Sequence, residues 1–188
     1  MPRRAHHRPH SGHAGFSLVE LLIATAVLGV VVGIALPSWR WAVGASHAAS
    51  TQSSLYDTLT SNLRLSTVYA ENVVLCASHD GHSCSGSTQW EGGWISFLDR
   101  DKDRAPGAGE PIVGRQPALG FDDVRLLSTS GRTRIVFQPH GGVNAGSNVT
   151  FTLCDARGPA RASAVIIANS GRMRLGTPSA AAAAACPR

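Results

Sequence analysis

The strongest hydrophobic pattern in the chain is one long apolar run, which extends from Leu18 to Leu36 and contains a single charged residue, Glu20. Because a helix rises about 1.5 Å per residue, this run would span roughly the 30 Å hydrocarbon core of a bilayer. An ordinary secretory signal would end in a small-x-small cleavage site, and residues 33–41 offer a poor one. The run therefore predicts a membrane helix in which the carboxylate has a functional partner.

A second helical pattern follows this run. Leu55, Leu59 and Leu63 recur at i, i+4 and i+8, with Ser, Thr, Asn and Asp between them, which is typical of an amphipathic helix. We predict one helix over about residues 16–70, loosened or kinked at Pro37. Its first half would lie in lipid or in a filament core, and its second half would pack on the chain's own domain.

From Val73 onward the pattern changes to short β-prone runs that are separated by Gly, Pro, Asp and Asn. The runs are residues 73–76, 94–98, 111–114, 124–127, 133–137, 149–154, 164–168 and 172–175. Several short strands after one long helix predict an α+β domain whose antiparallel sheet packs on that helix. The low-complexity tail from Thr177 is expected to be poorly ordered unless Cys186 ties it down.

The junction before the apolar run carries a motif. The segment G-F-S-L-V-E-L-L-I, which starts at Gly15, resembles the cleavage and methylation signal of type IV pilins and type II secretion pseudopilins. The resemblance implies that a prepilin peptidase cuts between Gly15 and Phe16 and methylates the new Phe16 terminus. It also implies that Glu20 compensates the N-terminal amine during assembly with a neighbouring subunit. Two opposite charges in lipid are tolerable only when they pair with each other, which is consistent with this role of Glu20.

The β-prone region extends the resemblance over nearly the whole mature chain. The segments Q-W-E-G-G-W-I-S-F-L-D-R-D-K-D-R, G-S-N-V-T-F-T-L-C-D-A-R-G and S-G-R-M-R-L are similar to those of the GspH/FimT group of minor pseudopilins. The chain departs from the group at its tail and at Arg104, a place often held by glycine. The resemblance implies a type IV pilin-like fold. It also implies either a minor pilin, some of which bind DNA during natural transformation, or a minor pseudopilin of type II secretion.

The domain organisation follows from these patterns. Residues 1–15 hold three arginines, four histidines and no acid, so this leader is expected in the cytoplasm and is expected to be removed. Residues 16–41 form the transmembrane or filament-core half of the helix, and residues 42–72 form its amphipathic half. Residues 73–176 form the β domain and residues 177–188 the tail. The expected location is the bacterial inner membrane, single-pass, with the C-terminal domain in the periplasm or on a pilus.

The four cysteines are even in number, and disulfides are the default in an oxidising periplasm. Cys76 with Cys84 closes a short loop, and Cys154 then pairs with Cys186, although the sequence leaves two other pairings open. A zinc set is the less favoured alternative, because its ligand spacing is tighter than the usual finger pattern. That set would consist of Cys76, His79, His82 and Cys84.

Four acids have the spacing of a calcium loop. Asp99, Asp101, Asp103 and Glu110 occupy positions 1, 3, 5 and 12 of such a loop, but position 6, which should be glycine, is Arg104. No flanking helices are expected, and Arg100, Lys102 and Arg104 are expected to neutralise the acids. A solvated hairpin turn is therefore favoured over calcium, and no cofactor or metal is predicted. No enzyme is predicted either, since no nucleophile motif such as G-x-S-x-G is present.

Charge is distributed unevenly along the domain. Residues 71–119 carry seven acids and four bases, whereas residues 120–188 carry three acids and eight arginines. Two pairs of these arginines are spaced two apart, which in a strand puts both members on one face: Arg132 with Arg134, and Arg172 with Arg174. Such pairs on neighbouring hairpins would make a basic stripe suited to phosphate contacts. In DNA-binding FimT-type members the closing G-R-x-R carries the contact, and residues 171–174 match it.

The sequence therefore predicts a minor pilin or pseudopilin that assembles with other pilins into a pilus-like filament. It also predicts that the C-terminal arginines bind DNA without sequence specificity. One alternative is a minor pseudopilin of a type II secretion system. A further alternative is a membrane-anchored periplasmic binding domain that never joins a filament.

Overall fold

The computed structural model describes residues 15–186, which divide into two compact units with a boundary between Trp39 and Arg40. The long helix α1 runs from Leu18 to Tyr69, with Pro37 inside it. In the first unit its apolar side chains are exposed. Among the described residues, α1 is one helix long and apolar enough to cross a membrane.

In the second unit the C-terminal half of α1 buries one face. Ala48, Leu55 and Leu59 belong to the main core, and Thr51, Asn62 and Ser66 are buried on the same face. These positions recur every three or four residues, which is the spacing of one helix face. The structure therefore confirms the predicted amphipathic half.

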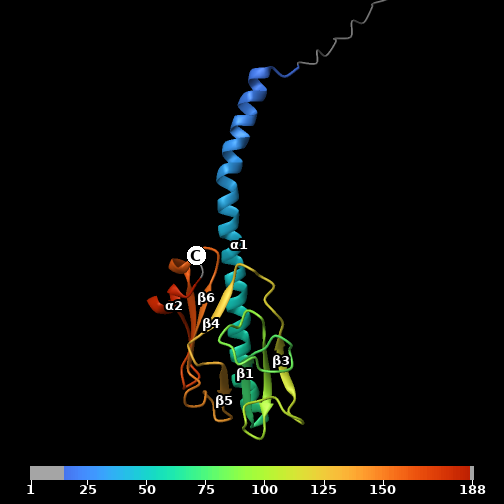
Figure 1. Cartoon of the computed structure of the whole chain (residues 1–188), viewed down its shortest axis with the longest axis vertical. Helices are drawn as coiled ribbons and strands as arrows, with labels where there is room; N and C mark the ends of the chain where they lie inside the picture. Colours follow the sequence, from blue (N-terminus) through green and yellow to red (C-terminus); the bar gives the residue numbers. More distant parts are fainter. Residues whose placement is uncertain (1–14, 187–188) are drawn as a thin grey trace, which may run out of the picture. The chain divides into compact units, whose positions relative to one another are not determined.

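Within residues 72–176 the strands form two antiparallel sheets, each four-stranded, with the orders β3-β2-β1-β5 and β4-β6-β7-β8. Figure 1 shows strands of both sheets gathered around the C-terminal half of α1. Each predicted β-prone run overlaps one strand, so the α+β fold with antiparallel strands on a long helix is confirmed. The strands are β1 (Asn72–Ala77), β2 (Trp94–Asp99), β3 (Ile112–Gln116), β4 (Arg125–Ser128), β5 (Arg134–Phe137), β6 (Val149–Cys154), β7 (Ser163–Ile167) and β8 (Met173–Gly176).

One main hydrophobic core joins the helix to both sheets. Leu55 and Leu59 pack with Trp94 and Phe137 from the first sheet side and Phe151 from the second. Each large apolar side chain buried in this way contributes about 1.5–3 kcal/mol of transfer free energy. The shared core therefore fixes the two sheets relative to each other and to the second half of α1, which determines which loops meet at the surface.

The C-terminal tail is held against the second sheet. A short helix, α2, runs from Ala180 to Ala184, and Ser179 caps it by accepting a hydrogen bond from the Ala182 N–H. Cys186 forms a disulfide with Cys154 of β6 and is buried beside it. The tail was expected to be ordered only if Cys186 anchors it, and the structure contains this anchor.

Candidate nucleic-acid interface

The register of the second sheet sets a row of side chains that ends in an arginine. Arg174 on β8 is opposite Ile166 on β7, and Ile166 is opposite Thr150 on β6. On the far side of β6, the Thr129 N–H donates to the Thr150 carbonyl at 3.0 Å. This row of side chains extends from β8 across β7 and β6 to the β4–β5 connection. Because neighbouring strands lie about 4.8 Å apart, it covers a few strand spacings.

Arg132 lies at the other end of this row. Arg132 and Arg174 line the same hollow, which has a volume of about 500 Å³, and the described residues that line it include no acid. The Arg132 Nε donates to the Asn148 carbonyl at 3.1 Å, which fixes the direction of that side chain. Two arginines from segments about 40 residues apart in sequence thus face one hollow.

A second hollow adjoins the first through Arg132. It has a volume of about 300 Å³ and is lined by Arg104, Arg132 and Arg134, again without an acid among the described lining residues. The Arg134 Nε is buried and has no hydrogen-bond partner among the described residues. We call the surface formed by Arg104, Arg132, Arg134 and Arg174 the arginine face.

The arginines do not pair along single strands as predicted. Arg134 begins β5 and Arg174 lies within β8, but Arg132 and Arg172 each precede the strand. Arg172 is exposed in the turn between β7 and β8. The arginine face is therefore built across the sheets by loops and register rather than by period-two alternation along one strand. Arg104 was missed, because its place in the sequence is among the acids of the β2–β3 loop.

The turn that carries the G-R-x-R motif is compact. The Gly171 N–H donates to the Ala168 carbonyl at 2.8 Å, and the Ala168 N–H donates to the Arg172 carbonyl at 3.0 Å. Gly171 has φ +79°, in the left-handed region that favours glycine. The motif glycine thus closes the turn that starts β8 and directs Arg174 onto the arginine face.

The disulfides have the pairing that the sequence favoured, Cys76 with Cys84 and Cys154 with Cys186. The zinc alternative needed both thiolates of the first pair as ligands. Because Cys76 and Cys84 are bonded to each other, the structure argues against that zinc set.

The methylation signal lies at the start of α1. Gly15 and Phe16 precede the helix and are exposed, and Ser17 Oγ accepts a hydrogen bond from the Glu20 N–H at 3.2 Å. This is the N-terminal half of a capping box, which defines where the helix begins. The Gly15–Phe16 bond therefore lies in non-helical backbone, and the Glu20 side chain is exposed one turn into the helix. The leader histidines lie outside the described residues.

A methylation-type N-terminus, a long helix with an apolar first half, and a β domain packed on the second half define a type IV pilin-like subunit. The family model described as type II transport protein GspH matches residues 63–171, and the chain belongs to this family. The prokaryotic N-terminal methylation motif matches residues 10–36. The chain is thus a minor pilin or pseudopilin, a structural subunit rather than an enzyme, as predicted.

Solved structures give the same fold. The chain is similar to the type IV minor pilin FimU of Pseudomonas aeruginosa in one crystal form, with 14% identity and a TM-score of 0.54, covering 77% of this chain and 92% of FimU. A second crystal form of FimU gives 15% identity, a TM-score of 0.51, and coverage of 76% and 96%. At these identities the likeness is one of fold.

A third similarity is to the minor pseudopilin EpsH of the type 2 secretion system of Vibrio cholerae, with 12% identity and a TM-score of 0.48, covering 71% of this chain and 98% of EpsH. A search of curated protein sequences gave no match. The family and the methylation motif imply assembly with other pilins and processing by a prepilin peptidase. With the apolar half of α1, they fit an inner-membrane anchor and a periplasmic domain.

Proposed function

We propose that the mature chain, cut between Gly15 and Phe16, joins a type IV pilus-like filament and binds DNA through the arginine face. The observation that carries the DNA proposal is the convergence of four arginines on two adjoining hollows without an acid among the described lining residues. On a filament, this surface would meet DNA outside the inner membrane.

The chemistry of the arginine face suits phosphates. Guanidinium groups bind phosphate oxygens in a bidentate way, and the hydroxyl of Thr150 in the first hollow adds a neutral donor. A phosphate in the second hollow would meet the Arg134 side chain, which lines that hollow. Contacts of this kind position the backbone and carry no base information, so binding is expected to be independent of sequence.

The size of the surface limits the affinity. Four arginines neutralise at most about four phosphates, which gives a slope of log K against log salt of about −3.6. Binding is therefore expected to be weak, with a Kd on the order of micromolar or weaker at physiological salt. Each arginine removed should make the slope shallower by about one.

The experiment measures affinity of the detergent-solubilised full chain for duplex DNA of two unrelated sequences across a monovalent salt series. Divalent cations are left out because they compete for phosphate. Arg132→Ala with Arg174→Ala should weaken binding at least tenfold and reduce the salt slope by about two. Adding Arg104→Ala and Arg134→Ala, the other two arginines of the face, should nearly abolish binding.

The matched control is Arg115→Ala with Arg161→Ala, which removes the same charge elsewhere. Arg115 lies on β3, at the opposite edge of the first sheet from β5, and Arg161 lies in the short helix η1 (Pro159–Arg161) between β6 and β7. Arg100→Ala with Arg104→Ala would not serve as a control, since Arg104 lines the second hollow. Equal losses in test and control variants would make net charge responsible rather than a site.

If the wild-type chain shows no salt-sensitive binding, the DNA proposal is wrong. The secretion-type alternative is then the better one, since the matched family model is described as a type II transport protein. A subunit of that kind would bind other pseudopilins and exported proteins instead of nucleic acid.

A further inference from the structure

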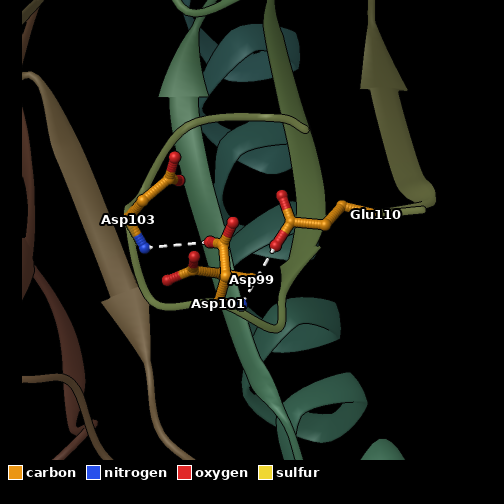
Figure 2. A group of neighbouring side chains, drawn as sticks. All are labelled: Asp99, Asp101, Asp103 and Glu110. Carbon is orange, nitrogen blue, oxygen red and sulfur yellow. Dashed lines mark hydrogen bonds between the residues drawn. The ribbon is translucent and has the colours of Figure 1, made fainter. Parts of the chain in front are cut away.

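Four carboxylates, one at the end of β2 and three in the β2–β3 connection, lie close together. One carboxylate oxygen from each of Asp99, Asp101, Asp103 and Glu110 lies within 4.8 Å of the other three (Figure 2). Glu110 is folded back over the loop, since its Oε1 accepts from the Arg100 N–H at 2.7 Å and its Oε2 from the Gly107 N–H at 2.9 Å. The loop thus concentrates four negative charges in a space the size of one ion's coordination sphere.

Asp99 has an oxygen that the protein leaves unsatisfied. The residue is 2% exposed, and Oδ2 has no hydrogen-bond partner among the described residues. Its other oxygen, Oδ1, accepts a hydrogen bond from the Arg104 N–H at 3.1 Å. A buried acceptor of this kind is costly unless a proton or a cation satisfies it.

The basic residues interleaved with these acids do not neutralise them directly. Arg100 pairs with Glu71 and also donates to the Gly109 carbonyl, and Arg104 lines the arginine face. Among the described residues, no ion pair within 4.0 Å joins the four acids to a base. This differs from the sequence-based expectation that Arg100, Lys102 and Arg104 neutralise the loop.

Arg104, which stands where a calcium loop has glycine, does not prevent the turn that such a loop needs. Arg104 has φ +64°, so it adopts the left-handed conformation that position 6 of a calcium loop requires, and its N–H donates to Asp99 Oδ1 at 3.1 Å. A non-glycine residue in this conformation costs roughly 1–2 kcal/mol, so other interactions of the loop must hold Arg104 in it. The backbone therefore has the turn that brings positions 1, 3, 5 and 12 together.

We propose that the loop from Asp99 to Glu110 binds one calcium ion. Calcium–oxygen distances of about 2.3–2.6 Å place oxygens on opposite sides of the ion about 4.6–5.2 Å apart, which agrees with the spread of the four carboxylates. Magnesium, at about 2.0–2.1 Å, needs a tighter octahedron. The calcium ion satisfies Asp99 Oδ2 and offsets the repulsion among the four charges.

The affinity expected is that of extracellular calcium modules, with a Kd of about 10⁻⁴–10⁻³ M. The test uses the full chain in detergent, stripped with EDTA and dialysed. Calorimetric titration with CaCl₂ at constant ionic strength should give one ion per chain. At a calcium concentration ten times the Kd, the folding equilibrium constant should rise about tenfold, which raises Tm by roughly 3–6 °C.

The test variant is Asp101→Asn with Asp103→Asn. These changes keep the Oδ1 acceptors for the Asp103 and Ala105 N–H groups, so the turn is retained while two charges are lost. Calcium affinity should fall at least tenfold, whereas Tm in EDTA should not fall, because two repelling charges are gone. The control is Asp57→Asn with Asp122→Asn, two exposed acids outside the cluster, which should leave the affinity unchanged.

The wild-type titration tests calcium binding by the loop even if the variant does not fold. Absence of heat and of any Tm change up to 10 mM CaCl₂, on the order of ten times the weakest expected Kd, would overturn the proposal. An equal Tm rise with MgCl₂, or an equal loss of calcium affinity in the control variant, would overturn it too, because both indicate general charge screening.

Discussion

Gly171 and Gly142 lie in direct backbone contact, where the turn before β8 meets the loop after β5. A Cβ on Gly171 would lie 3.0 Å from the Gly142 Cα and 3.2 Å from Leu63 Cδ2 on α1. Nearby, the Val143 N–H donates to the Asn169 carbonyl at 2.9 Å. The glycine of the G-R-x-R motif therefore joins the two sheets beside the arginine face, and this gives it a structural reason to be glycine.

Gly171→Ala should lower the free energy of unfolding by about 2–3 kcal/mol, because it adds left-handed strain to a contact with backbone that cannot move away. Gly120→Ala is the control, since Gly120 has a similar φ of +71° but nothing within 4 Å of a Cβ. Gly120→Ala should cost only about 1 kcal/mol. Denaturant unfolding of both variants in detergent measures the difference, and equal losses would mean that the close approach contributes nothing.

The sequence predicted the elements well but not how they meet. The run from Leu18 to Leu36 and the strand positions could be read from hydrophobic periodicity, because burial on one face imposes that period on each element. The hollow shared by Arg132 and Arg174 could not, because it depends on which strands pair and in which register. Arg104 was assigned to the acidic loop for the same reason: that it lines the second hollow with Arg132 and Arg134 depends on the packing of the β2–β3 loop beside β5.

Next to the Cys154–Cys186 disulfide, the buried carboxylate of Asp155 pairs with the half-buried guanidinium of Arg157. The Asp155 side chain is 2% exposed, and Arg157 donates to it from Nε at 2.9 Å, from Nη2 at 2.6 Å and from its backbone N–H at 2.8 Å. Burial acts to raise the pKa of Asp155, but the hydrogen bonds and charge of Arg157 outweigh it, so the pKa lies below its ordinary value of 3.8.

Arg157→Ala should lower the free energy of unfolding by about 3 kcal/mol at pH 7, because it leaves a buried carboxylate unpaired. Arg161→Ala, an exposed change of equal charge, should stay within about 0.5 kcal/mol of wild type. Since the folded-state pKa of Asp155 is lowered, the stabilisation is complete above pH 3.8 and is lost as the pH falls through the folded-state value. In Arg157→Ala the guanidinium no longer opposes burial, which then raises the pKa of Asp155 above its ordinary value. Urea unfolding from pH 7 to pH 2 should therefore show the difference between wild type and Arg157→Ala shrinking as the pH falls through this raised value and on through the lowered wild-type value; a difference that stays constant over this range would contradict this assignment.

Processing at Gly15–Phe16 can be read directly from the mature N-terminus. Because this bond lies in exposed backbone before α1, the peptidase reaches it without unwinding the helix. Mass spectrometry of protein from the native membrane should find an N-methylated Phe16. Gly15→Val should block the cut without disturbing the fold, since nothing lies within 4 Å of a Cβ at this position. An intact Met1 in the wild type, or a terminus near residue 40, would contradict the pilin-type signal.

Glu20→Gln separates processing from assembly. The side chain is exposed on α1, and the cap at Ser17 involves only the Glu20 backbone N–H, so the change should alter neither helix nor fold. Removing a charge makes the run more apolar, and membrane insertion and cleavage should continue. Incorporation into filaments should nonetheless fall, because the methylated amine of Phe16 in the neighbouring subunit would be left in an apolar environment without a counter-charge.

Thr25→Val is a matched control in the same segment: the Thr25 hydroxyl donates only to carbonyls of its own helix, Leu21 and Leu22, so its loss should leave incorporation unchanged. The measurement is the fraction of processed subunit that is recovered with sheared filaments. If Glu20→Gln is recovered at the wild-type fraction, the pairing between carboxylate and amine does not drive assembly, and Glu20 needs another partner within the membrane.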